Sequence, residues 1–203
     1  MDLVLVHGMG RTPISMIGLQ HRFREQGHTP HLFGYSPTFE SLQKVTNRLV
    51  SLIQNSIGPK SYALIGHSLG TVIIRNAYPH LSLHQPSACF FLAPPMVACT
   101  AAKFFSKVWL YRVMTGEMGQ LLAQENFVEQ LTLPANTKIY AGTGGPRGAW
   151  LPFGHALNDG ILSIAEASGN QSTAVVTVPS IHTFIMNSTV VFEDIAHSLD
   201  ALD

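Results

Sequence analysis

A short string with a serine between two glycines offers the clearest chemistry in the sequence. Residues 66–70 read GHSLG, and apolar runs flank the string on both sides. Between a buried strand and a helix, such a string makes a sharp turn that pushes the serine hydroxyl out above the strand end. Glycines suit positions 66 and 70 because a Cβ would clash with the closely packed chain there. We predict that Ser68 is a nucleophile; the alternative is a serine in a purely structural turn.

A nucleophilic serine needs a base to accept its proton and an acid to orient that base. After a nucleophile turn of this kind, the acid comes next along the chain and the histidine comes last. Asp159 is the only aspartate between Asp2 and Asp194, and it lies in the loop string NDG. Glu166 is the nearest rival, but it falls in a short predicted helix. We therefore predict that Asp159 is the acid.

Two histidines follow Asp159 in the sequence, His182 and His197. His182 comes directly after a predicted strand, in the string SIHTF, whereas His197 falls inside the last predicted helix. Ser68, Asp159 and His182 would then each lie at the carboxyl end of a strand, where open parallel sheets bind ligands. This coincidence predicts that His182 is the base. We expect His67, the neighbour of the serine, to pack or hydrogen-bond locally.

Attack of a serine on a carbonyl also requires hydrogen-bond donors for the oxyanion that forms. The first predicted donor is the backbone N–H of Leu69, the residue after the nucleophile. The second must come from the loop after the first strand, which reads HGMG at residues 7–10. Glycines on both sides of Met9 allow a close approach of the backbone, so we predict its N–H as the second donor. His7 is expected to pack locally.

The elements that must position these residues alternate between strand and helix almost throughout. Such alternation is typical of right-handed crossovers and a parallel sheet. It predicts a three-layer α/β core of about six mostly parallel strands with helices on both faces. The predicted strands are 3–6, 31–35, 62–65, 88–93, 138–141 and 173–178. The predicted helices are 13–26, one from a cap at Thr38 to Gly58, 69–78, and 184–199.

One segment is too long for a simple crossover, so we predict a single domain over 1–203 with 96–134 as a helical cap insertion. Residues 101–115 would form a helix that is apolar almost all round, which predicts either burial or contact with an apolar ligand. In the second case Phe105 and Trp109 would line an acyl pocket. Trp150 and Phe153, in the long loop after the fifth strand, could add a wall to it.

Composition and charge exclude several other classes of function. Twelve Lys and Arg balance twelve Asp and Glu, without a basic run, which argues against a nucleic-acid or anionic-membrane partner. The two cysteines match no metal spacing or disulfide framework, and no cofactor is expected. The apolar run at residues 3–6 is too short for a signal peptide or a membrane anchor, so we expect a cytoplasmic protein. The oligomeric state is left open.

These strings together resemble those of the α/β-hydrolase superfamily over nearly the whole chain. VLVHGMG is similar to its oxyanion loop, GHSLG to its nucleophile turn, NDG to its acid loop and SIHTF to its histidine loop. NDGILS and Arg75 favour a small lipase or serine esterase, close to the GPI-inositol-deacylase-like lipases. The chain departs from the family in lacking the first two strands of a full-size member. It also carries Thr71 where a third glycine is common.

The resemblance implies hydrolysis of small-molecule carboxylic esters, a class that includes lipids, without a cofactor. Ser68 would attack the ester, His182 would take its proton, Asp159 would orient His182, and an acyl-enzyme would form. A fold of this kind does not determine its substrate. The alternatives are therefore a thioesterase, amidase or acyltransferase, or a catalytically silent protein that binds an apolar ligand or a partner protein.

Overall fold

The computed structural model of the protein describes residues 1–97, 116–122, 124–169 and 174–202. Its centre is one sheet of six strands in the order β2-β1-β3-β4-β5-β6, and every neighbouring pair is parallel. The predicted α/β core is thus confirmed. The strands are β1 Asp2–Val6, β2 Thr29–Phe33, β3 Tyr62–His67, β4 Ala88–Leu92, β5 Thr137–Gly142 and β6 Val175–Val178.

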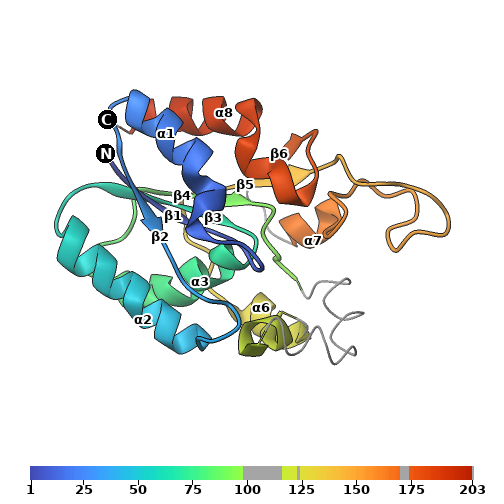
Figure 1. The fold of residues 1–203 in the computed structure, drawn as a ribbon, viewed down its shortest axis with the longest axis horizontal. Coiled ribbons are helices and arrows are strands. Elements are labelled where there is room, and N and C mark those ends of the chain that lie inside the picture. Colours follow the sequence, from blue (N-terminus) through green and yellow to red (C-terminus); the bar gives the residue numbers. More distant parts are fainter. Residues whose placement is uncertain (98–115, 123, 170–173, 203) are drawn as a thin grey trace.

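Helices cover both faces of the sheet (Figure 1). α1 (Ile17–Glu25) and α8 (Thr189–Asp200) lie on one face, and α2 (Leu42–Leu52) and α3 (Leu69–Ala77) lie on the other. Two short helices follow later in the chain, α6 (Glu125–Gln130) and α7 (Ile164–Ser168). The remaining helical turns are Pro13–Met16, Ile53–Ile57, Tyr78–Leu81 and His182–Asn187.

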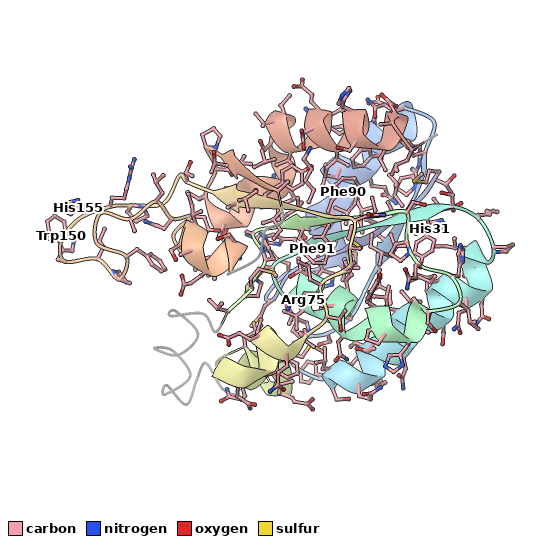
Figure 2. The ribbon with its side chains drawn as sticks, turned by 180° about the vertical axis from the view of Figure 1, so that it is seen from behind. His31, Arg75, Phe90, Phe91, Trp150 and His155 are labelled. Carbon is pink, nitrogen blue, oxygen red and sulfur yellow. The ribbon has the colours of Figure 1, made fainter. Side chains whose placement is uncertain are left out.

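The apolar side chains of the strands divide between two cores, one on each face. Consecutive side chains of a strand point to opposite faces, and Figure 2 shows this for Phe90 and Phe91 of β4. Phe91 belongs to the core under α2 and α3, and Phe90 to the core under α1 and α8. The continuous apolar strands in the sequence are therefore explained by burial on both faces.

Several predicted boundaries were wrong by a few residues. β2 begins at Thr29 and includes Pro30, which a strand tolerates at the sheet edge because one side needs no ladder bond. α2 is capped by Ser41, whose hydroxyl accepts a bond from the Lys44 N–H, and not by Thr38. The last α-helix starts only at Thr189, because a 3-10 turn, His182–Asn187, precedes it.

Arg75 connects α3 to both ends of the segment between β4 and β5. Its buried guanidinium lies 2.6 Å from the carbonyl of Leu131, 2.8 Å from that of Val128 and 3.5 Å from that of Pro95. Burial lowers the pKa of Arg75 to about 10. The side chain is placed below the sheet in Figure 2, toward α6. A buried cation bonded to carbonyls holds the ends of the predicted insertion against the core.

The middle of the predicted insertion, with the predicted pocket residues Phe105 and Trp109, lies outside the described residues. Its described part contains helical residues 116–121 and α6. Within the described ranges, no helix is both long enough and apolar enough to cross a membrane.

Candidate active site

The predicted nucleophile lies in a strained turn between β3 and α3. Ser68 has φ 50° and ψ −118°, a left-handed conformation that residues other than glycine rarely adopt. Its N–H donates to the carbonyl of Leu92, at the end of β4 (2.9 Å). A Cβ on Gly66 would lie 2.8 Å from the Cδ1 atom of Ile74, and one on Gly70 would overlap the carbonyl of Val6. Both glycines therefore provide the clearance that the sequence predicted.

Thr71, where a third glycine is common among similar sequences, has a local role in this turn. Its hydroxyl donates to the carbonyl of Ser68 (2.7 Å), and its N–H donates to the same oxygen (2.9 Å). Two donors on one carbonyl fix the peptide that follows the serine. Thr71 thus adds to the rigidity of the nucleophile turn.

The loop after β5 buries the carboxylate of Asp159 and satisfies it. One oxygen, Oδ1, accepts the N–H groups of Ile161 (2.9 Å) and Leu162 (2.7 Å). The other, Oδ2, lies 2.7 Å from Nδ1 of His182. Only 1% of the Asp159 side chain is exposed. The two backbone donors hold the carboxylate in one orientation.

Asn158 and the glycines of the same loop hold the backbone around Asp159 in place. The sequence did not lead us to predict this role. The buried amide of Asn158 donates to the carbonyls of Pro146 and Ala156 and accepts the N–H of Gly160. A Cβ on Gly142 would lie 2.7 Å from the Cβ of Asp159. Gly142 and Gly145 therefore allow close packing against the loop of Asp159, and Gly144 allows it against Ser180 and Ile181. The run of glycines in residues 142–145 was the sequence signal for these contacts.

His182 lies between Asp159 and Ser68. Its ring atom Nε2 is 3.0 Å from Oγ of Ser68, and its backbone N–H donates to the backbone carbonyl of Asp159 (2.9 Å). An ionised carboxylate can only accept, so Nδ1 carries the proton and Nε2 has a free lone pair toward the hydroxyl. An arrangement of this kind can pass a serine proton to the imidazole while the carboxylate stabilises the imidazolium.

The predicted oxyanion loop approaches the same point. A Cβ on Gly8 would lie 3.2 Å from the Cβ of Ser68, so the backbone after β1 passes directly beside Ser68. Met9 follows and packs against the core under α2 and α3. Leu69 is the first residue of α3, where N–H groups have no partner within the helix. Both backbones therefore adjoin Ser68.

Solved structures with a similar fold are α/β-hydrolases. The mature lipase BlEst2 of Bacillus licheniformis matches with a TM-score of 0.73 and 18% identity, over 98% of this chain and 91% of the lipase. An extracellular α/β-hydrolase of a Paenibacillus species matches with a TM-score of 0.67 and 15% identity, over 97% of this chain and 98% of that one. This protein has the α/β-hydrolase fold.

A third structure with this fold is RedJ, a thioesterase from the prodiginine biosynthetic pathway of Streptomyces coelicolor. It matches with a TM-score of 0.57 and 13% identity, over 97% of this chain and 83% of RedJ. No family model matches the sequence, and no curated protein matches it. At these identities, the structural similarity establishes the α/β-hydrolase fold alone. The reaction has to be inferred from the side chains of the candidate site.

The rival residues have other places in the α/β-hydrolase fold. Glu166 forms a capping box at the start of α7, where its carboxylate accepts from the N–H and the hydroxyl of Ser163. His197 is exposed on α8. Trp150 is 88% exposed near the tip of the loop between β5 and α7, which projects from the body in Figure 2, and Phe153 in that loop is partly buried. Among the described residues, the hydrogen bonds of Ser68 involve neither Trp150 nor Phe153.

Two buried histidines, His7 and His67, lie near Ser68. His7 stacks on Tyr35 with ring centroids 4.2 Å apart, and the Tyr35 hydroxyl donates to the His7 carbonyl (2.7 Å). Nε2 of His67 lies 3.0 Å from the backbone carbonyl oxygen of His182. Burial lowers the pKa of His7 and lowers that of His67 well below the ordinary value, so both rings are neutral near pH 7. Among the described residues, no cluster of histidine, cysteine and carboxylate groups could hold a metal ion.

Proposed function

We propose that this protein is a serine hydrolase that cleaves carboxylic esters. The observation that carries the proposal is the chain of contacts from Asp159 through His182 to Ser68, at 2.7 and 3.0 Å. The strained backbone of Ser68 adds support, because such strain concentrates at functional sites. The hydrolases among the structures with this fold agree with the proposal.

In the proposed reaction, Oγ of Ser68 attacks the ester carbonyl while Nε2 of His182 takes the hydroxyl proton. The N–H groups of Met9 and Leu69 hold the oxyanion of the tetrahedral intermediate. His182 then donates its proton to the leaving alcohol, and an acyl-enzyme remains. Water attacks the acyl-enzyme with His182 as base, which releases the acid and restores Ser68. The finer assignment, to the GPI-inositol-deacylase-like lipases, rests on NDGILS and Arg75 alone.

The proposal predicts turnover of p-nitrophenyl esters and its loss in Ser68→Ala. We expect kcat to fall by at least about 10⁴-fold, because removal of the nucleophile leaves only binding and the oxyanion donors. A series of acyl lengths from acetate to laurate measures the pocket. Activity that peaks on acetate indicates an esterase, and activity that peaks on long chains indicates a lipase.

Matched thioesters and anilides of the preferred acyl group complete this test. The thioesterase RedJ shares the fold, so the thioester is the specific competitor. A higher kcat/KM for the ester than for the thioester supports the proposal. Turnover of the thioester alone, or equal turnover by wild-type protein and Ser68→Ala, contradicts it.

A further inference from the structure

The imidazole of His67 contacts two of the segments that converge on Ser68. His67 is the last residue of β3, directly before Ser68, and it is 2% exposed. Its Nε2 lies 3.0 Å from the backbone carbonyl of His182. A carbonyl can only accept, so Nε2 must carry the hydrogen, and His67 donates to the main chain of the proposed base.

The opposite edge of the same ring packs against the oxyanion loop. A Cβ on Gly8 would lie 2.7 Å from Nδ1 of His67 and 3.1 Å from its Cε1. The ring centroids of His67 and His182 are also 5.1 Å apart, at an angle of 49°. One buried side chain therefore contacts the loop that carries Met9 and the loop that carries His182.

The loop that carries His182 is held on either side of it: the N–H of Gly144 donates to the carbonyl of Ser180 (3.0 Å), and Ile185 and Met186 are buried in the core under α1 and α8. Closer to His182, Ile181 and Phe184 are 41% and 54% exposed, so these two side chains anchor the loop weakly. The carboxylate of Asp159 bonds to the imidazole of His182, and its backbone carbonyl accepts the backbone N–H of His182. Asp159 is itself part of a loop. Among these partners, His67 is the one that belongs to a central strand of the sheet.

We propose that His67 is a positioning residue that sets the distance between His182 and Ser68 by holding the His182 carbonyl and the oxyanion loop. This inference rests on the proposed hydrolase function. Neutrality of the ring is part of the role, because a charged His67 would oppose the imidazolium that forms on His182. Its burial, which lowers its pKa, provides that neutrality.

A matched set of variants tests the donor directly. In His67→Gln the amide nitrogen reaches the place of Nε2, whereas in His67→Asn it reaches only that of Nδ1. His67→Met fills the space without a donor. We expect kcat to fall about 10- to 100-fold in the Asn and Met variants, with KM changed less than twofold, because a small misplacement of a base costs this much. His67→Gln should stay within about threefold of wild type.

Each variant is first checked for cooperative thermal unfolding, and the kinetic comparison uses those that fold. A kcat for folded His67→Asn or His67→Met that equals that of wild type overturns the inference. So does an equal loss in the Gln, Asn and Met variants, which indicates a packing role only. The imidazole NMR signals of His182 give a second readout without turnover: we expect one sharp set in wild type and His67→Gln, and exchange broadening in the other two.

The two proposals fail in different ways. Wild-type protein that hydrolyses no ester contradicts the hydrolase function and leaves the NMR comparison to decide on His67. Signals of His182 that are equally sharp in all variants overturn the positioning role, whether or not the protein is an esterase.

Discussion

Asp159→Asn is expected to lower kcat by about 10³- to 10⁴-fold while KM changes little. The carboxylate accepts from two backbone N–H groups and from Nδ1–H of His182. In the variant, the amide oxygen takes the place of Oδ1 and keeps both backbone bonds, and the amide nitrogen turns its hydrogens toward His182. Nδ1 must then accept, so the ring proton moves to Nε2, where it faces Ser68 and blocks proton transfer. The loss corresponds to about 4–5.5 kcal/mol of barrier.

Glu166→Gln is the matched control, because Glu166 is the rival acid and lies in the same part of the chain. Its carboxylate caps α7, so the variant should lower stability by about 1 kcal/mol and leave kcat within a factor of two. Steady-state kinetics on one short-chain ester measures both variants. A kcat for Asp159→Asn within tenfold of wild type would exclude Asp159 as the acid, and a large loss in Glu166→Gln would replace it.

Acid should destabilise the protein well before its carboxylates titrate, because His7 and His67 are buried and neutral. Burial lowers the pKa of each imidazole from 6.5, the ordinary value that the unfolded chain retains. Below about pH 6.5 the unfolded state therefore binds protons that the native state does not, so stability falls as pH falls. Each group contributes up to about 1.4 kcal/mol per pH unit, and the pair up to about 2.7 kcal/mol per unit.

Urea unfolding at pH 7.5, 6.5 and 5.5 measures this slope. His67→Gln removes one of the two groups, so the decline in the free energy of unfolding between pH 6.5 and 5.5 should become about half as steep. His155→Gln, at an exposed position near the tip of the projecting loop, is the control and should leave the slope unchanged. Equal stability of wild type at pH 7.5 and 5.5 would show that both rings charge without cost in the fold.

The sequence was sufficient to predict the α/β core and the residues that lie together around Ser68. A strand that is buried on both faces has a continuous apolar run as its sequence pattern, and most of these runs are followed by a segment with helical spacing. The scarcity of aspartates left little choice of acid, and chain order left little choice of histidine. The structure brings Ser68, Asp159 and His182 within hydrogen-bond distance, and their catalytic roles stay proposals.

The supporting contacts could not be predicted because they join segments far apart in the sequence. His67 bonds to a carbonyl 115 residues away, and a single sequence does not show which backbone will face a side chain. Asn158 looked like an ordinary turn residue beside Asp159, although its amide holds three backbone groups. The predicted helix cap at Thr38 and the predicted start of the second strand after Pro30 were wrong. Tertiary packing selected Ser41 as the cap and an edge strand that begins at Thr29.

Reaction with a fluorophosphonate, followed by peptide mass spectrometry, tests the central claim most directly. The reagent phosphonylates a serine only when a base activates the hydroxyl, so it reports the Ser68–His182 pair without a choice of substrate. We predict one adduct, on the peptide that contains Ser68, which is absent in Ser68→Ala and in heat-unfolded wild type. An unlabelled Ser68 in the folded protein, or labelling that persists in Ser68→Ala, would contradict the account.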